Sequence, residues 1–483
     1  MSQRFLTAAL FALLAAGSLP AQQLVSVTPL GTKSQSELLA QFNIIFIQFG
    51  ARYYRITYTT TGLQGQPDTV SGLLAVPDNP NKVYPRIVYQ HGTSGSKLDV
   101  PSFNYGQGLE GSVGLLLAGM GYVALLPDYL GLGVSDGFHP YVHAASEAQV
   151  AIDMLHAAAA FTAQNDVHTN SQLFITGYSQ GGHAAMALHR EIDRNWSDEF
   201  TVTASAPLSG PYSISGVMRN LILTDKIYYY PAYLPNTILS YQTVYGNIFD
   251  QISDVFKPKY ASTIQLYYEN KISLTDLNIN LFSLLTLNEG ECRPFRMLQD
   301  SVVQAVLNDP AHPMNLALKD NDVYNDWTPQ APMRLFYCTA DDQVPFGNSV
   351  LASDTLLAAG AVNFLAQDVN PTADHGACYS PAMTNAVLFF FGFQQIGTLS
   401  AATAPEKERL ELYPNPAAST VTLKNLPARG HLTVVDYSGH RLKSVALESG
   451  SQTLPVNDLP DGVYMVLFEY QGKVQREKLI VRH

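Results

Sequence analysis

The 483-residue sequence has little charge and almost no cysteine. Asp, Glu, Lys and Arg make up 14% of it, three residues are cysteine, and the formal net charge is -12. Because no basic stretch offsets this negative charge, nucleic acid and anionic lipid headgroups are disfavoured as partners, and an uncharged substrate fits better. The sequence also has no Cys-x-x-Cys, no His-Glu-x-x-His and no Gly-rich phosphate loop with a lysine. We therefore expect no cofactor, neither a metal nor a nucleotide.

No stretch of the sequence is long and apolar enough to span a membrane comfortably. The apolar run over residues 5–16 follows Arg4 and precedes small residues near Ala21, a pattern typical of a cleavable secretory signal peptide. An N-terminal anchor is the alternative, but this run is short for a membrane span. The sequence therefore predicts a signal peptide over residues 1–21 and an exported, soluble mature chain with no transmembrane segment.

Apolar residues are abundant, at 46%, and the length suffices for a large core in two or three domains. Residues 53–58 and 70–76 predict an antiparallel hairpin at one edge of a sheet, and residues 34–48 predict a helix that covers the sheet. From Arg86 onward, short apolar strands alternate with helical stretches, the pattern of parallel strands joined by crossover helices. The predicted strands are residues 87–89, 122–126, 173–176, 202–207, 333–338 and 362–367, and the clearest predicted helix is 146–161.

Residues 173–183 contain the motif Gly177-Tyr178-Ser179-Gln180-Gly181. A β-prone run precedes the motif and an Ala-rich, helix-favouring segment follows it, which predicts the strand, sharp turn and helix of a nucleophile elbow. Such a turn exposes the serine hydroxyl to a base, and the flanking glycines leave room for its strained backbone. The alternative is a Gly/Ser loop without a chemical role. The flanking elements favour Ser179 as a nucleophile.

Two backbone N–H groups are candidates for an oxyanion hole. The loop Gln90-His91-Gly92-Thr93 follows a predicted strand, at the sheet edge where Ser179 must emerge, and we assign one donor to Thr93. The second donor is the N–H of Gln180, directly after the proposed nucleophile. An ordinary tight turn with a surface histidine is the alternative interpretation of the His-Gly pair.

Three carboxylates that follow predicted strands are candidates for the acid that orients a catalytic base. Asp341 and Asp342 both follow strand 333–338, and Asp341 is favoured because Asp-x-x-Val-Pro is the commoner form of this loop. Asp128 lies in a Gly-rich turn, where a carboxylate more often accepts backbone N–H bonds. We therefore predict a structural role for Asp128.

His375 is the candidate base. In proteins with this elbow the order along the chain is Ser, then Asp or Glu, then His, and His375 is the only histidine between Asp341 and the C-terminal region. We predict that it stands in a Gly-flanked loop after a strand. His139 and His143 are candidates for the pocket entrance without a part in the chemistry, and His183, inside the helix after the elbow, is predicted to be structural.

The three cysteines are Cys292, Cys338 and Cys378. In an oxidising compartment they would give one disulfide and one free thiol, or remain as buried thiols. The preferred pair is Cys338 with Cys378, because these two residues flank the proposed acid and base. The sequence does not choose between the alternatives.

Four further segments complete the predicted domain organisation. Residues 212–332 lack the strand and helix alternation but are rich in tyrosine, which predicts a cap inserted over the carboxyl ends of the strands. Residues 381–394 predict a final helix of a catalytic domain that covers residues 22–396. Residues 397–409 have the composition of a linker, and the short strands over residues 410–483 predict a small β-sandwich.

From Gln90 to His375 the sequence resembles the α/β-hydrolase superfamily, and within it the secretory lipase and esterase branch. The resemblance implies an α/β-hydrolase fold, with a mostly parallel sheet, helices on both faces and a helical cap insertion that gates an acyl pocket. It also implies triad roles for Ser179, Asp341 and His375. The sequence departs from the family at Cys338, where relatives often have glycine, and the cap has no motif that indicates a substrate. The stretches that carry the resemblance are residues 89–93, 127–133, 139–141 and 177–183 and the loops of Asp341 and His375.

Residues 410–483 resemble the sorting domain that directs cargo to the type IX secretion system of Bacteroidetes. The matching stretches are residues 412–417, 436–439, 459–464 and 478–482. The resemblance implies contact with the type IX machinery, passage through the outer membrane and a secreted or cell-surface location. Removal of the domain, or its attachment to the surface, often accompanies this export.

The sequence therefore predicts an exported serine hydrolase that cleaves carboxylic esters through a Ser-His-Asp triad and an acyl-enzyme. Small-molecule, lipid and aromatic esters all remain open as substrates, and so does the distinction between lipase and esterase. One alternative is a peptidase or amidase of the same fold, and the other is a non-catalytic surface binding module. Oligomeric state and the cap residues that line the pocket are not specified by the sequence.

Overall fold

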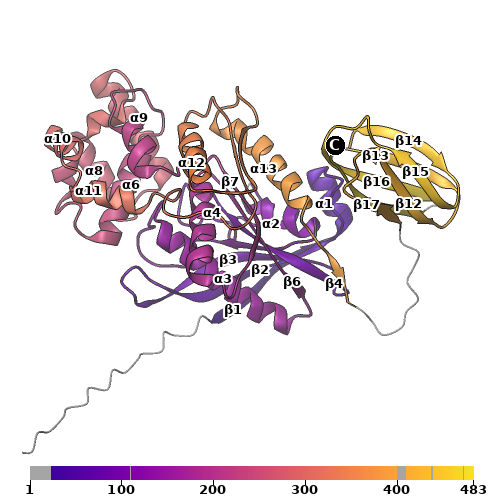
Figure 1. Cartoon of the computed structure of the whole chain (residues 1–483). Coiled ribbons are helices and arrows are strands. Elements are labelled where there is room, and N and C mark those ends of the chain that lie inside the picture. Colours follow the sequence, from indigo (N-terminus) through magenta and orange to yellow (C-terminus); the bar gives the residue numbers. More distant parts are fainter. Residues whose placement is uncertain (1–22, 109, 400–409, 437–438, 472) are drawn as a thin grey trace, which may run out of the picture.

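The computed structural model of the chain describes residues 23–108, 110–399, 410–436, 439–471 and 473–483. The predicted signal peptide, residues 1–21, lies outside the described residues, and so do residues 400–409 of the predicted linker. Figure 1 shows a central sheet with its helices, a helical lobe on one side and a β-sandwich on the other.

Within the described residues, ten strands form one sheet in the order β1-β2-β3-β5-β4-β6-β7-β8-β9, with β10 paired to β4. The strands from β5 to β9 in this order are parallel neighbours, whereas β1, β2, β3 and β5 pair antiparallel. The sheet is therefore mixed but mostly parallel in its centre. Its strands are β1 Leu24–Lys33, β2 Ala51–Thr61, β3 Pro67–Pro77, β4 Lys82–Gln90, β5 Val123–Pro127, β6 His168–Tyr178, β7 Val202–Leu208, β8 Met333–Tyr337, β9 Phe364–Asp368 and β10 Gly397–Thr398.

Helices cover both faces of this sheet because alternate residues of each central strand point to opposite faces. In β4, Ile87 joins the apolar cluster that includes α2 and α13, while Val88 joins the cluster that includes α3 and α4. In β6, Phe174 joins the first of these clusters and Ile175 joins the second. The covering helices are α1 Gln35–Phe42, α2 Glu110–Gly119, α3 Ala144–Gln164, α4 Gln180–Glu191, α12 Gly347–Ala358 and α13 His375–Phe391.

The N-terminal part of the sheet differs from the prediction in two ways. The predicted hairpin exists as β2 and β3, but β1 pairs antiparallel outside β2, so the hairpin is not at the edge. The sequence of β1, LVSVTPLGTK, contains a proline and a glycine and is mostly exposed, which removes the usual signals of a strand. The predicted helix over residues 34–48 begins as expected after Ser34, whose capping box includes Glu37, but it ends at Phe42, where Asn43 adopts a φ of 53°.

The segment between β7 and β8, here called the cap, is helical and has an apolar cluster of its own. Ser273 forms a capping box with Asp276 at the start of α9, and Gly290 ends that helix with a φ of 81°. In Figure 1 the cap helices lie together as a lobe beside the sheet. They are α5 Arg219–Ile222, α6 Tyr233–Tyr245, α7 Ile252–Val255, α8 Pro258–Tyr268, α9 Leu274–Glu289, α10 Asp300–Asn308 and α11 Pro313–Asp320, with a π-helix at Ile214–Met218 and a 3-10 turn at Pro294–Met297.

The C-terminal part is a sandwich of two antiparallel sheets, β11-β12-β15 and β14-β13-β16-β17, over a separate apolar cluster. Its Lys478 donates hydrogen bonds to the carbonyls of Phe391 and Gln394 at the end of α13. The short strand β10 belongs to the main sheet, although the sequence predicts a linker from residue 397. The sandwich strands are β11 Glu411–Tyr413, β12 Thr420–Leu426, β13 Gly430–Val435, β14 Arg441–Leu447, β15 Gly450–Pro455, β16 Gly462–Tyr470 and β17 Lys473–Val481.

Across the described ranges, no helix combines the length and the apolar character that crossing a membrane requires.

Candidate active site

Ser179 stands at the sharp turn between β6 and α4 with a φ of 60° and a ψ of -121°, a conformation that is strained for a residue with a side chain. The two glycines of the motif make this turn possible. A Cβ on Gly177 would lie 2.3 Å from the carbonyl oxygen of Gly181, and a Cβ on Gly181 would lie 1.9 Å from that of Gln90. The turn therefore accepts no side chain at either position.

One line of hydrogen bonds joins Ser179, His375 and Asp341. His375 Nε2 lies 2.8 Å from Ser179 Oγ, and His375 Nδ1 lies 2.7 Å from Asp341 Oδ2. The Asp341 side chain is 1% exposed and that of His375 is 7% exposed, so both are shielded from bulk water. The backbone N–H groups of Gln343 and Val344 donate to Asp341 Oδ1 at 3.0 and 2.8 Å, which fixes the carboxylate. This arrangement can move a proton from the serine hydroxyl to the imidazole and stabilise the resulting imidazolium.

The neighbouring Asp342 has a different partner. Its Oδ1 accepts the backbone N–H of His375 at 3.1 Å, so it contacts the main chain of this residue and not the imidazole ring. The two adjacent carboxylates thus both hold His375, one through the ring and the other through the backbone.

His375 is the first residue of α13, and not part of a loop as the sequence predicts. Asp374 caps this helix by accepting the N–H of Ala377 at 2.8 Å. The prediction that the helix begins at Pro381 is wrong, because Pro381 lies inside α13. Because proline is favoured in the first turn of a helix, Pro381 suggests a start of the helix that is later along the chain than the true one.

A disulfide joins Cys338 and Cys378, which confirms the preferred pairing. Cys338 follows β8 and precedes the Asp341 loop, while Cys378 lies on the first turn of α13 after His375. The bond therefore connects the segments that carry the two side chains. The remaining cysteine, Cys292, is buried in the cap, where burial raises the pKa of its thiol to about 11.

The loop of Thr93 passes close to Ser179. A Cβ on Gly92 would lie 4.0 Å from Ser179 Cβ, and the N–H of Gly92 is held by Glu110 Oε1 at 3.1 Å. Among the described residues, the backbone N–H groups of Thr93 and Gln180 donate to no protein acceptor. Both groups are therefore available to a substrate oxygen.

The side chain of Gln180 is fixed by a buried network that the sequence does not reveal. Its Nε2 donates to Glu147 Oε1 at 2.9 Å and contacts His139 Nε2 at 2.8 Å. Because His139 Nδ1 lies 2.8 Å from the carbonyl of Leu130, that nitrogen carries the hydrogen and Nε2 accepts. Burial lowers the pKa of His139 to about 4, which agrees with a neutral ring. Glu147 Oε2 also contacts His183 Nδ1 at 2.7 Å, so His183 belongs to the same network.

Asp128 accepts hydrogen bonds from the hydroxyls of Ser71 and Ser102 at 2.6 and 2.5 Å and is completely buried. It does not contact Ser179 or His375. These contacts agree with the structural role that the sequence predicts for it.

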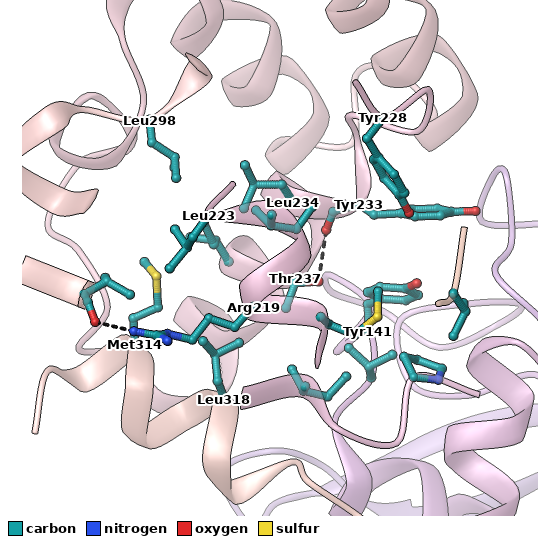
Figure 2. A pocket seen from close by; sticks show the side chains of 18 of the residues that line it. Tyr141, Arg219, Leu223, Tyr228, Tyr233, Leu234, Thr237, Leu298, Met314 and Leu318 are labelled. Carbon is teal, nitrogen blue, oxygen red and sulfur yellow. Dashed lines mark hydrogen bonds between the residues drawn. The ribbon is translucent and has the colours of Figure 1, made fainter. Parts of the chain in front are cut away.

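An apolar cavity of about 90 Å³ is lined by Ser179 and by residues of the cap. At one end, Tyr228 and Tyr233 donate their hydroxyls to the backbone and side-chain oxygens of Gln343, both at 3.0 Å. Figure 2 shows these tyrosines with Tyr141 on one side of the cavity. On the other side of the view lie Leu223, Leu298, Arg219, Met314 and Leu318.

Comparison with known proteins identifies the C-terminal part and the fold. Residues 411–482 match the family of secretion system C-terminal sorting domains. The rice cell wall degrading esterase LipA from Xanthomonas oryzae is 27% identical with a TM-score of 0.66, over 76% of this chain and 95% of LipA. A Legionella pneumophila protein assigned as a hydrolase is 25% identical with a TM-score of 0.67, over 77% of this chain and 98% of that protein. No curated protein matches the chain significantly.

Candida antarctica lipase A, at 15% identity and a TM-score of 0.57, covers 76% of this chain and 81% of its own, and shares the fold alone. The main sheet with its helices has the α/β-hydrolase fold of these neighbours. Likeness to esterases and hydrolases supports a hydrolase, and the type IX sorting domain indicates export to the surface or the medium. Together they support an exported esterase.

Proposed function

We propose that this protein is a serine hydrolase that cleaves carboxylic esters outside the cell. The observation that carries the proposal is the hydrogen-bonded line from Asp341 through His375 to Ser179, whose hydroxyl lines an apolar cavity. An apolar cavity beside a nucleophilic serine suits the acyl part of an ester. Likeness to an esterase supports the same substrate class.

In the first half of the reaction, Ser179 Oγ attacks the ester carbonyl carbon while its proton moves to His375 Nε2. Asp341 Oδ2 accepts the Nδ1 hydrogen of His375 and stabilises the imidazolium that forms. The N–H groups of Thr93 and Gln180 stabilise the oxyanion of the tetrahedral intermediate. When this intermediate collapses, His375 Nε2 returns the proton to the leaving alcohol and the acyl group stays on Ser179.

In the second half, a water molecule attacks the acyl carbon and gives its proton to His375 Nε2. The same two N–H groups stabilise the second oxyanion. When it collapses, the bond between Ser179 Oγ and the acyl carbon breaks, His375 Nε2 returns the proton to Oγ, and the carboxylic acid is released. Each group thus acts twice, once with the ester and once with water.

The test is the initial rate of hydrolysis of p-nitrophenyl esters from acetate to palmitate, with Ser179→Ala as the control. We expect hydrolysis by the wild-type protein and a loss of about three orders of magnitude or more in kcat for the variant. A variant that retains most of the wild-type rate would contradict the proposal.

A further inference from the structure

The apolar cavity of the cap contains a single charged side chain among the residues that line it, Arg219 at the start of α5. Figure 2 shows Arg219 beside Met314 and Leu318, on the side away from Tyr228 and Tyr233. Since those tyrosines contact Gln343 near Asp341, Arg219 stands toward the end of the cavity that is remote from Ser179.

The guanidinium of Arg219 is held by uncharged groups. Its Nε donates to Asn315 Oδ1 at 2.9 Å, and its Nη2 donates to the carbonyl of Val306 at 2.6 Å. No carboxylate of the described residues forms a salt bridge with it. A guanidinium has five N–H donors in a fixed fork, so these two contacts orient the group and leave other donors available.

The other two arginines of the cap provide a contrast. Arg293 pairs with Glu291, and Arg296 pairs with Asp225 at 2.8 Å and with Glu289 at 3.6 Å. Both of these arginines therefore have acidic partners within the protein. Arg219 alone of the three lines the apolar cavity, where it is half-buried and has no carboxylate partner among the described residues, so an anionic group of a ligand would find there a cation that no such carboxylate already pairs with.

The shape of the cavity restricts what this ligand can be. The space of about 90 Å³ is small, yet its lining extends from Ser179 through α5 and α6 to α10 and α11. A lining of mostly apolar side chains from so many elements suits the methylene groups of an acyl chain. Most of the cavity walls are apolar, and Arg219 is the one lining side chain that could pair with an anionic group.

We propose that the cavity takes a linear acyl chain whose far end is a carboxylate, and that Arg219 pairs with this carboxylate. The substrates would be monoesters of linear α,ω-dicarboxylic acids. This proposal rests on the proposed function, because it assumes that the acyl group is attached to Ser179. The net negative charge of the chain favours uncharged substrates in general, but Arg219 is a local exception that acts at short range.

The experiment compares two series of p-nitrophenyl esters of equal chain length. One series has linear monocarboxylic acids from octanoate to myristate, and the other has the mono-esters of dicarboxylic acids from suberate to tetradecanedioate. For the wild-type protein, the ratio of kcat/KM for dicarboxylate over monocarboxylate should peak at one chain length, because Arg219 has a fixed position. A charge-assisted pair corresponds to a factor of about 10 to 100 in this ratio.

Arg219→Gln tests the charge while keeping N–H donors for Val306 and Asn315. We expect this variant to lower the ratio about 10-fold to 100-fold and to abolish the peak, whereas Arg219→Lys keeps part of the preference. Arg296→Gln is the matched control, since it removes a cap arginine that does not line the cavity, and it should leave the ratio unchanged. A ratio that is the same in Arg219→Gln and the wild-type protein would overturn the proposal.

A binding measurement separates this proposal from the proposed function. Calorimetric titration of Ser179→Ala with monomethyl esters of the same dicarboxylic acids requires no turnover. We expect binding that weakens about 10-fold or more when Arg219→Gln is added. Absence of hydrolysis with Arg219-dependent binding would refute the proposed chemistry alone, and binding that is indifferent to Arg219 would refute the carboxylate site.

Discussion

The core and the cap contribute to the same site in different ways. In the core, the three hydrogen-bonded side chains stand directly after β6, after β8 and at the start of α13, where short local motifs surround them. In the cap, the cavity is lined by single residues from several helices, and no motif joins them. The positions of the three side chains are therefore specified locally, by turns and helix N-caps, whereas the lining of a binding cavity depends on how whole helices pack.

The largest expected effect lies in the core, at the two adjacent carboxylates. Asp341→Asn should lower kcat by about three to four orders of magnitude, because Asp341 contacts the ring of His375. Asp342→Asn should lower kcat by about 10-fold at most, because Asp342 contacts only the backbone N–H of His375. Steady-state kinetics on one p-nitrophenyl ester measures both. A greater loss for Asp342→Asn would reverse the assignment of the acid.

In the cap, the expected effect depends on the substrate. Leu298→Trp should fill part of the cavity and lower kcat/KM for long-chain esters by about 10-fold or more, while acetate is affected much less. Leu287→Trp is the matched control, because Leu287 is 82% exposed on the outer surface of the cap. An equal loss for all chain lengths in Leu298→Trp would show that the cavity does not hold the acyl chain.

The disulfide offers a test of how firmly the core holds its reactive groups. Replacing Cys338 and Cys378 together by Ala should lower the free energy of unfolding by about 3–4 kcal/mol, since the bond closes a loop with a sequence separation of 40. We also expect kcat to fall several-fold with little change in KM, because the bond connects the Asp341 loop to α13. Thermal unfolding and kinetics are measured on the same samples. Cys292→Ala in the cap should leave kcat unchanged, and an equal loss of kcat in both variants would contradict a specific role of the disulfide.

The smallest expected effect is on the pH dependence of stability. The pKa of His139 is lowered to about 4 in the folded protein, so the unfolded chain binds more protons between about pH 4 and pH 6.5. The contribution of His139 to stability should therefore rise with pH through this range and be lost as the pH falls, by about 2 kcal/mol between pH 7 and pH 5. His139→Gln should reduce this difference, measured by denaturant unfolding at both pH values.

His431→Gln is the control for this pH experiment, because His431 is exposed in the sandwich. It should leave the pH dependence as in the wild-type protein. An unchanged slope in His139→Gln would mean that this histidine is not kept neutral by burial.

Much of the core could be predicted from the sequence because its signals are local. The parallel strands are short apolar runs, and the sharp turn at Ser179 is marked by two glycines that its backbone requires, as the close approach of Gly181 to Gln90 shows. Asp341 and His375 could be selected by their order after Ser179, and the structure brings both into one hydrogen-bonded line with it. The start of α13 could not be predicted, because Asp374 as an N-cap residue is a weaker sequence signal than the proline inside the helix.

The remaining features depend on contacts between distant segments. β1 has a proline, a glycine and an exposed pattern, so only its pairing with β2 makes it a strand. Glu147 lies on α3 without any motif, and its contact with Gln180 follows from the packing of α3 against α4. Arg219 is similarly inconspicuous in the sequence. Its position is defined only in the fold, where it contacts Val306 of α10 and Asn315 of α11.

Reaction of the wild-type protein with a fluorophosphonate, followed by mass spectrometry of the labelled peptide, tests the central claim most directly. The reagent forms a stable adduct only with a serine that is activated by a neighbouring base. We predict a single adduct, on Ser179, and none on the Ser179→Ala protein. An unlabelled wild-type protein, or an adduct on a different serine, would contradict the assignment of Ser179 as the nucleophile.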